Sequence, residues 1–324
     1  MVAAAPRVGL VLGAGGVAGG AFHSGVLAAL AEVTGWDPRR AAVIVGTSAG
    51  SITGTSLRAG LSAPDLLARS EGRPLSAQGN AVLRRVGPLR SPPPLRPTRQ
   101  VRRPAEVAAI LRRAAARPFA APPWALLSAL MPDGSVSTDI IAEGIAGLFP
   151  QGWPDDPLWI CAVRQVDGRR VVFGRDSQPS LHDAVAASCA IPGFFTPVAI
   201  DDTAYVDGGV HSPTNADVLA DPALGISLVL VSSPMSRSGR ALRLGVDQPV
   251  RRWCSGLLGA EAVRLRRRGT HVLAFQPTDA DAAVMGPNAM DPRRRAAIAR
   301  QAYESTHRRL EREDTRARLA PLLG

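Results

Sequence analysis

Short apolar runs alternate along the chain with longer segments of helical pattern. Between strands, the pattern predicts helices at Ala21–Ala31, Ala49–Arg58, Pro64–Ser70, Pro104–Ala116, Pro123–Met131, Ser137–Leu148, Leu181–Ser188, Val250–Arg268 and Pro292–Leu310. Runs rich in β-branched residues predict the strands at Arg7–Leu12, Val43–Val45, Leu158–Arg164, Arg169–Arg175, Val198–Ile200, Ala204–Val206, Ile226–Ser232 and His271–Phe275. Strands that alternate with helices favour an α/β fold, with a mostly parallel sheet covered on both faces.

The length of 324 residues suits one large domain with insertions. We expect a single domain over residues 1–324, with a core at about 7–280 and C-terminal helices at about 250–310. No run of eighteen apolar residues occurs, so we expect no transmembrane helix. The glycine-rich N-terminal run fits a first core strand and its loop better than a cleavable signal.

Positive charge is concentrated in one segment. The net charge is +11, and residues 72–117 hold eleven arginines, one acid and seven prolines, a local balance of +10. This composition predicts a mobile basic insertion rather than core. Two roles fit it equally: a solvated linker, or a flap that meets an anionic surface such as lipid headgroups. The segment lacks interleaved aromatics and a nucleic-acid-binding motif, which disfavours nucleic acid as a partner.

The three cysteines predict neither disulfides nor a metal site. Cys161, Cys189 and Cys254 are scattered and have no metal-ligand spacing. A reducing compartment fits this usage best, so we expect a cytoplasmic protein without a bound metal.

A nucleophile motif follows the second predicted strand. Gly46-Thr47-Ser48-Ala49-Gly50 is a G-x-S-x-G sequence between a β-branched run and a predicted helix. This strand–turn–helix context is the one in which such a serine stands on a sharp turn with its hydroxyl exposed. Ser48 is therefore the candidate nucleophile.

A glycine-rich loop follows the first predicted strand, at Gly13–Gly20. Two chemistries fit it. Dinucleotide binding matches Gly13-x-Gly15-x-x-Ala18, but it requires an acidic residue at the end of the second strand, where Gly46-Thr47-Ser48 stands instead. An oxyanion hole serving Ser48 requires only free backbone amides, so we favour it.

The serine needs a base, and two candidates lie close together in the sequence. Asp207 ends a predicted strand and precedes Gly208-Gly209, which permits close approach of its carboxylate to the serine. His211 follows four residues later and would complete a conventional triad.

Three segments together resemble the patatin-like phospholipase family: Gly9–Leu30, Val45–Ser51 and Ala184–Leu219. The last of these is the most specific, with an ASxAIP segment, a hairpin and a DGG at the family's spacing. The resemblance implies a three-layer α/β/α sandwich and a Ser–Asp dyad without a catalytic histidine. By motif position, Ser48 is the nucleophile, Asp207 the general base, and the amides of Gly15 and Gly16 the oxyanion hole.

The glycine loop departs from the family pattern, which usually reads G-G-G-x-(Arg or Lys)-G. This chain has Ala14 at one glycine position and Ala18 where the basic residue belongs. Backbone amides survive such changes, but the lost cation affects loop anchoring or binding of an anionic headgroup.

The resemblance implies a serine acyl hydrolase that cleaves lipid carboxyl esters through an acyl-enzyme, without metal or cofactor. Peripheral contact with an anionic membrane surface is the expected partner interaction. An acyltransferase on the same dyad and a catalytically weak lipid-binding or scaffold protein remain alternatives. The sequence leaves the oligomeric state open.

Overall fold

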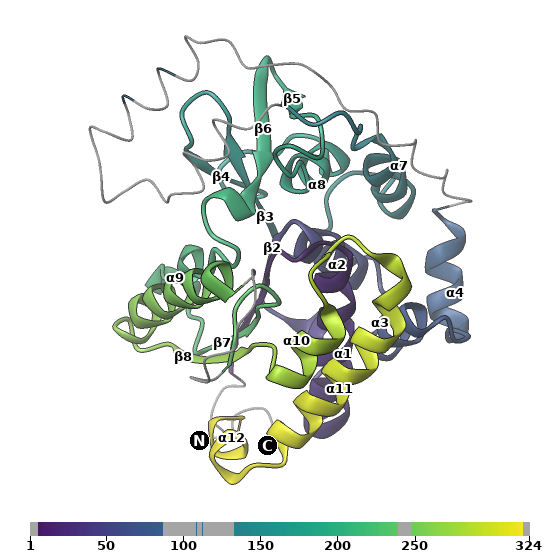
Figure 1. Ribbon diagram of the computed structural model, residues 1–324, viewed down its shortest axis with the longest axis vertical. Coiled ribbons are helices and arrows are strands. Elements are labelled where there is room, and N and C mark those ends of the chain that lie inside the picture. The colour runs from purple at the N-terminus through teal and green to yellow at the C-terminus, as the bar shows by residue number, and fades with distance from the viewer. Residues whose placement is uncertain (1–5, 87–107, 109–111, 113–132, 239–247, 320–324) are drawn as a thin grey trace.

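The computed structural model describes residues 6–86, 108, 112, 133–238 and 248–319. All the strands of the described part belong to one sheet with the order β5-β6-β3-β2-β1-β7-β8, and β4 pairs with β3 (Figure 1). The strands are β1 (Val8–Leu12), β2 (Val43–Thr47), β3 (Leu158–Arg164), β4 (Arg170–Phe173), β5 (Val198–Ile200), β6 (Thr203–Asp207), β7 (Leu228–Ser232) and β8 (His271–Phe275).

The sheet is parallel from β3 to β8 and antiparallel at its other end. β1 pairs in parallel with both β2 and β7, β2 with β3, and β7 with β8. β4 and β6 both run antiparallel to β3, and β5 antiparallel to β6. The expected mostly parallel sheet is therefore confirmed, with a hairpin-built end.

Alternate residues of the central strands enter two separate cores, which is why these strands read as continuous apolar runs. Leu10, Ile44 and Leu230 face one core, and Val11 and Val45 the other. The helices are α1 (Gly16–Thr34), α2 (Ala49–Arg58), α3 (Ala63–Glu71), α4 (Ala77–Arg84), α7 (Asp139–Leu148), α8 (Leu181–Ser188), α9 (Gln248–Arg266), α10 (Asp279–Met285), α11 (Arg295–Leu310) and α12 (Glu313–Leu319).

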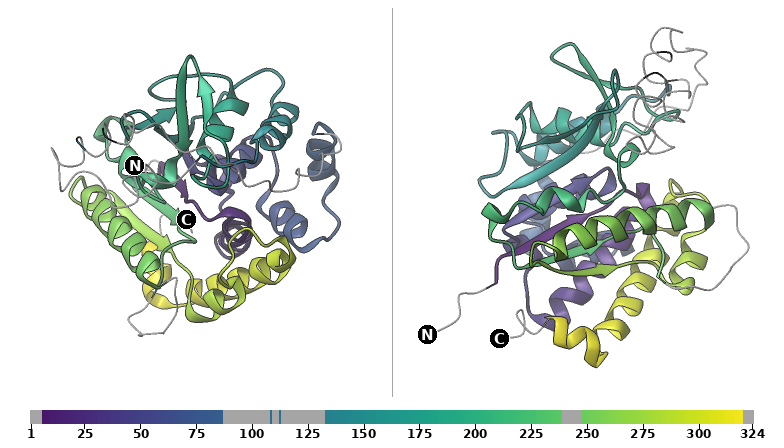
Figure 2. Two further views of the ribbon diagram at one scale, coloured as in Figure 1. Left: turned by 45° about the horizontal axis from the view of Figure 1, so that its top comes forward. Right: turned by 90° about the vertical axis from the view of Figure 1, so that its left-hand side faces the viewer.

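The helices form two layers around the sheet (Figure 2). Buried residues of α1, α2, α3, α8 and α11 belong to the first core, and those of α9 to the second. This arrangement is the predicted α/β/α sandwich. α1 is long and apolar enough to cross a membrane by length and composition, but 67% of that stretch is buried inside the fold. It packs against α11 and α3 as a core helix.

Register on β3 brings two distant strand ends together. β2 ends with Thr47 opposite Cys161, and β6 ends with Asp207 opposite the next residue, Ala162. β4 pairs with β3 across both positions, so β2 and β6 must share the other side of β3. Because these two strands run in opposite directions, their C-terminal ends meet head to head.

Several predicted boundaries were wrong. α1 begins at Gly16 rather than Ala21, so most of the expected glycine loop, from Gly16 to Gly20, is the start of a helix. Part of the basic insertion is also ordered: α4 lies within it, capped by Ser76 and with Val82 buried. The expected helices Pro104–Ala116 and Pro123–Met131 lie almost entirely outside the described residues.

Candidate active site

Ser48 stands at the junction of β2 and α2 in a strained conformation. Its φ of 54° and ψ of −121° lie in a region that non-glycine residues rarely adopt. The Ser48 N–H donates to the Ser188 hydroxyl at 3.0 Å, and that hydroxyl donates to the Cys161 carbonyl at 2.7 Å. The strained turn is therefore fixed to α8 and to β3.

The two glycines of the motif are required by close backbone contacts. A Cβ at Gly50 would lie 1.9 Å from the Leu12 carbonyl oxygen, and one at Gly46 would lie 2.5 Å from the Cα of Ser51. Only glycine therefore fits at either position without moving β1 or α2.

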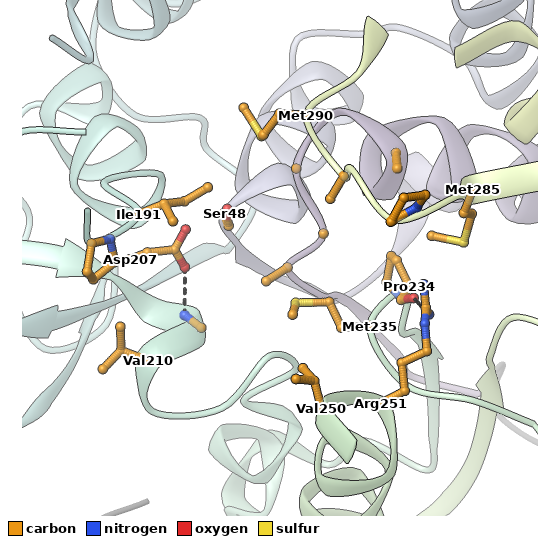
Figure 3. Close-up of a pocket in the computed structure, with 18 of the residues that line it drawn as sticks. Ser48, Ile191, Asp207, Val210, Pro234, Met235, Val250, Arg251, Met285 and Met290 are labelled. Carbon is orange, nitrogen blue, oxygen red and sulfur yellow. Dashed lines mark hydrogen bonds between the residues drawn. The ribbon is translucent and has the colours of Figure 1, made fainter. Parts of the chain in front are cut away.

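Asp207 ends β6 beside this turn, as the register on β3 requires. One carboxylate oxygen accepts a 2.7 Å hydrogen bond from the Gly209 N–H (Figure 3). Burial raises the pKa of Asp207 to about 6, against the opposing effect of hydrogen bonds from the Ser48 hydroxyl and from Gly209. Asp207 is thus a buried carboxylate with a pKa near neutrality, and it lies beside Ser48 (Figure 3).

The glycine loop lies opposite Ser48 at the start of α1. The Gly13 and Ala14 N–H groups donate to the carbonyls of Ser232 and Pro213, at 2.9 and 2.7 Å. Within the described part of the chain, the N–H groups of Gly15 and Gly16 donate no hydrogen bond. These two amides remain available to an anion at the positive end of α1.

The loop is anchored without the family's basic residue. The Ala18 N–H donates to the Ala289 carbonyl at 2.9 Å, and a Cβ at Gly16 would lie 2.8 Å from the Met290 sulfur. The segment after α10 therefore packs on the glycine loop and holds it by backbone contact. Sequence reasoning gave this segment no role, although the capping box of Thr278 and Asp281 signals the helix that precedes it.

The four predicted site residues, Gly15, Gly16, Ser48 and Asp207, line one cavity of about 510 Å³. Figure 3 shows Ser48 and Asp207 side by side at one wall, with the other side chains around them. The remaining lining is largely apolar, from Ile191, Val210, Pro234, Met235, Val250, Met285 and Met290. Such a lining suits an acyl chain.

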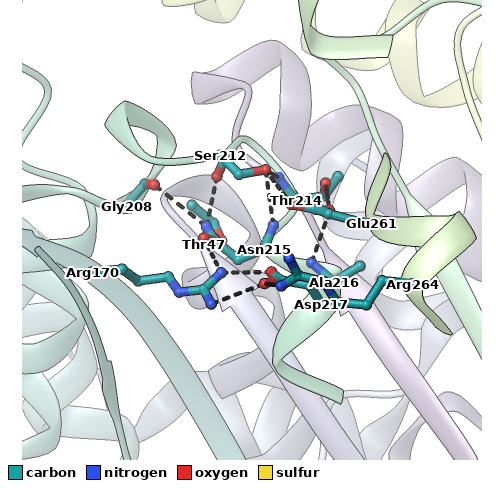
Figure 4. A network of polar contacts seen from close by, with 10 residues as sticks. All are labelled: Thr47, Arg170, Gly208, Ser212, Thr214, Asn215, Ala216, Asp217, Glu261 and Arg264. Atoms are coloured by element: carbon teal, nitrogen blue, oxygen red, sulfur yellow. Dashed lines mark hydrogen bonds and ion pairs between the residues drawn. The ribbon is translucent and has the colours of Figure 1, made fainter. Parts of the chain in front are cut away.

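Asn215 joins the turn that carries Ser48 to the turn that carries Asp207 (Figure 4). Its side-chain amide donates to the Thr47 hydroxyl at 3.1 Å and to the Gly208 carbonyl at 3.3 Å. Thr47 directly precedes Ser48, and Gly208 directly follows Asp207. Asn215 therefore fixes the position of the serine turn relative to the aspartate turn. The sequence contained no local signal for this role.

Glu261 of α9 holds the loop that carries Asn215. Its carboxylate accepts hydrogen bonds from the Ser212 and Thr214 hydroxyls, at 2.6 and 2.5 Å, and from the Ala216 N–H at 3.0 Å (Figure 4). Burial raises the pKa of Glu261. The predicted basic helix 250–268 is thus an amphipathic core helix with a buried acid.

The histidines lie outside this arrangement. His211 lies near Arg170, Asp217 and Arg264, and burial lowers its pKa to about 4. His23 is fully buried between the Ser232 hydroxyl, at 2.7 Å, and the Gly13 carbonyl, at 2.8 Å. Neither ring is among the groups that line the cavity around Ser48. In the described part of the chain, no cluster of three or more His, Cys, Asp or Glu residues could hold a metal ion.

Comparison with known proteins gave one family and several similar structures, of which two are described here. VipD from Legionella pneumophila shares 14% identity over 95% of this chain and 67% of its own, with a TM-score of 0.43. The type III effector protein ExoU shares 15% identity over 99% of this chain and 54% of its own, with a TM-score of 0.38. This chain thus spans about half the length of ExoU. No curated protein matches.

The family model described as patatin-like phospholipase matches residues 10–220, which contain the serine turn, the glycine loop and the Asp207 turn. That family implies lipid ester hydrolysis. Because the match covers more than half of the sequence, this chain belongs to the patatin-like phospholipase family.

Proposed function

We propose that the protein is a serine acyl hydrolase that cleaves lipid carboxyl esters through a Ser48–Asp207 dyad. One observation carries the proposal: a serine on a strained turn lies beside a buried carboxylate of raised pKa, in an apolar cavity. A carboxylate with a pKa of about 6 is ionised at neutral pH and still basic enough to accept a proton.

In the proposed mechanism, Asp207 takes the proton of Ser48 as the serine oxygen attacks the ester carbonyl. The Gly15 and Gly16 N–H groups hold the oxyanion, each contributing about 3–4 kcal/mol by analogy with other oxyanion holes. Collapse of the intermediate expels the alcohol, which receives the proton from Asp207. Water then attacks the acyl-serine, with Asp207 again as base, and releases the carboxylic acid.

Hydrolysis of p-nitrophenyl butyrate by the wild type, Ser48→Ala, Asp207→Asn and His211→Ala tests this proposal. We expect the first two variants to lose at least about 1000-fold in kcat, as removal of a nucleophile or its base does elsewhere. His211→Ala should retain activity. Loss of activity in a folded His211→Ala protein would replace the dyad with a triad. Absence of both turnover and fluorophosphonate labelling in the wild type would favour a lipid-binding role.

Transfer and hydrolysis use the same acyl-enzyme, so the products must be analysed. Release of free butyrate in the presence of glycerol supports hydrolysis, whereas formation of butyrylglycerol supports an acyltransferase.

We also infer that the protein works in the cytoplasm, at anionic membrane surfaces. The +10 balance of residues 72–117 supports this location. Cosedimentation with phosphatidylglycerol vesicles that weakens with salt, and is absent with phosphatidylcholine vesicles, is the expected result.

A further inference from the structure

A second cavity, of about 360 Å³, also reaches Ser48 and Gly16. It follows α2 from Ala49 to Ser56 and α1 from Val17 to Ser24. Because a helix rises 1.5 Å per residue, Ser56 lies about 12 Å along α2 from Ser48. This cavity is therefore a groove along α1 and α2 that leads away from the nucleophile. Its other wall is largely apolar, from Ile141, Cys189, Ile191, Phe195 and Met290.

Residues of α3 and α11 also line the groove. The Ser70 hydroxyl donates to the Ser24 hydroxyl at 2.9 Å, so the end of α3 lies beside the middle of α1. The Arg295 guanidinium donates to the carbonyls of Arg69 and Ser70. Arg69 and Arg295 both line the groove, and the contact of the Arg295 guanidinium with the Arg69 backbone places the two residues next to each other.

Arg69 has no partner for its charge in the described part of the chain. Its guanidinium makes no hydrogen bond or ion pair there, although the side chain is half-buried. Burial and the neighbouring Arg295 both lower the pKa of Arg69. The nearby carboxylate of Glu71 is occupied by Arg73 and Arg300.

Arg251, which lines the first cavity, provides a contrast. Like Arg295, it donates to two backbone carbonyls, those of Pro234 and Ser236 at 2.9 and 3.3 Å, whereas the Arg69 guanidinium donates to none in the described part of the chain. Burying the unpaired guanidinium of Arg69 near that of Arg295 costs free energy. An anion bound between the two groups would offset this cost.

We propose that this groove binds a phosphate group carried by the ester substrate, with Arg69 as its main ligand and Arg295 as the second cation. The proposal rests on the proposed function and narrows its substrate to a phosphorylated lipid ester. Arginine suits phosphate because its planar fork donates two parallel hydrogen bonds. Arg69 of α3 and Arg295 of α11 would then provide the positive charge that the family usually has at the position of Ala18.

Kinetics with two matched esters test the assignment: 1-octanoyl-sn-glycerol 3-phosphate and 1-octanoylglycerol. The full-length wild type should prefer the phosphate ester. In Arg69→Gln the ratio of the two kcat/KM values should fall about 10- to 100-fold, the range for a lost hydrogen bond to a charged group, mainly through KM. Arg69→Lys should retain part of the preference. Arg73→Gln, which removes an exposed arginine paired with Glu71 outside the groove, is the matched control and should keep the ratio.

Inhibition experiments distinguish a phosphate group carried by the lipid from free inorganic phosphate. sn-Glycerol 3-phosphate should compete with the phosphate ester in the wild type and lose this effect in Arg69→Gln. Inhibition by inorganic phosphate, without any preference for the phosphate ester, would assign the groove to free phosphate and overturn the proposal. An unchanged ratio in a folded Arg69→Gln protein would also overturn it.

Binding separates this proposal from the mechanism. Calorimetry of 1-octanoyl-sn-glycerol 3-phosphate with Ser48→Ala should show binding that the added Arg69→Gln substitution weakens about tenfold or more. This binding measurement does not depend on hydrolysis. If the wild type hydrolyses no ester, the proposed function is refuted, but the groove assignment can still be tested by binding. Equal binding to both proteins refutes the groove assignment alone.

Discussion

Two buried carboxyl groups, Asp207 and Glu261, lie on opposite sides of the same short loop and serve different purposes. Burial raises the pKa of both. Glu261 accepts hydrogen bonds from two hydroxyls and one N–H and is enclosed between α9 and the loop. Asp207 accepts a hydrogen bond from the Gly209 N–H and lines the cavity beside Ser48. The hydrogen bonds that Glu261 accepts support the fold. The Asp207 carboxylate, in contrast, can still accept a proton.

The largest expected effect comes from replacing Asp207 by an isosteric neutral group. Asp207→Asn should lower kcat for p-nitrophenyl butyrate by at least about 1000-fold, because the amide cannot accept the serine proton. Glu261→Gln, measured beside it at a temperature where both proteins are folded, should retain most of the activity. Equal losses in the two variants would contradict the division of roles.

The pH dependence of activity should follow Asp207. The base works as a carboxylate, so kcat/KM should rise with pH through an apparent pKa of about 6 and level off above it. Two pH units below that value, activity should be about 100-fold lower. A profile that remains flat down to pH 4 in a folded protein would exclude Asp207 as the base.

Replacing Glu261 should mainly lower the stability of the protein, whereas replacing Asp207 should mainly lower its activity. Glu261→Ala leaves two hydroxyls and the Ala216 N–H without their acceptor, and should lower the free energy of unfolding by roughly 3–4 kcal/mol. Glu261→Gln keeps one acceptor oxygen and should lose about half of that. Urea denaturation at pH 7 measures both, and an Ala variant as stable as the wild type would remove Glu261 from its supporting role.

The smallest expected effect is an increase in stability, in the variant Asp207→Asn at high pH. The pKa of Asp207 is raised on folding from 3.8 to about 6, so the folded state binds more protons in this interval and stability falls as pH rises through it. Asp207→Asn should therefore be more stable than the wild type by about 2–3 kcal/mol at pH 8. At pH 4 the difference should be close to zero. Denaturation at both pH values checks this, and a constant difference would contradict it.

Local sequence predicted the elements that carry the chemistry. The β-branched runs indicated the sheet, and G-x-S-x-G with its flanking strand and helix indicated the turn at Ser48. Asp207 was found from the end of a strand followed by two glycines. The start of α1 was missed because Gly19 and Gly20 disfavour a helix by propensity, whereas packing of Gly19 near Pro234 and Ala49 supports it.

Long-range contacts could not be predicted in the same way. Asn215 acts on Thr47, which is far away in the sequence, and Glu261 acts on the loop from another helix. The sequence pattern around Arg69 predicts only a short helix over Pro64–Ser70. The meeting of Arg69 with Arg295 depends on how α3 packs against α11, and no local pattern encodes that packing.

The head-to-head meeting of β2 and β6 on β3 makes this site a reporter of folding. In the proposed mechanism, Ser48 becomes reactive only when strands from three distant parts of the chain have paired in register, and a one-residue slip of β6 would turn Asp207 to the opposite face of the sheet. Such non-local pairing forms slowly. The rate at which a fluorophosphonate labels refolding protein should therefore follow the completion of the whole sheet, later than the appearance of its helices.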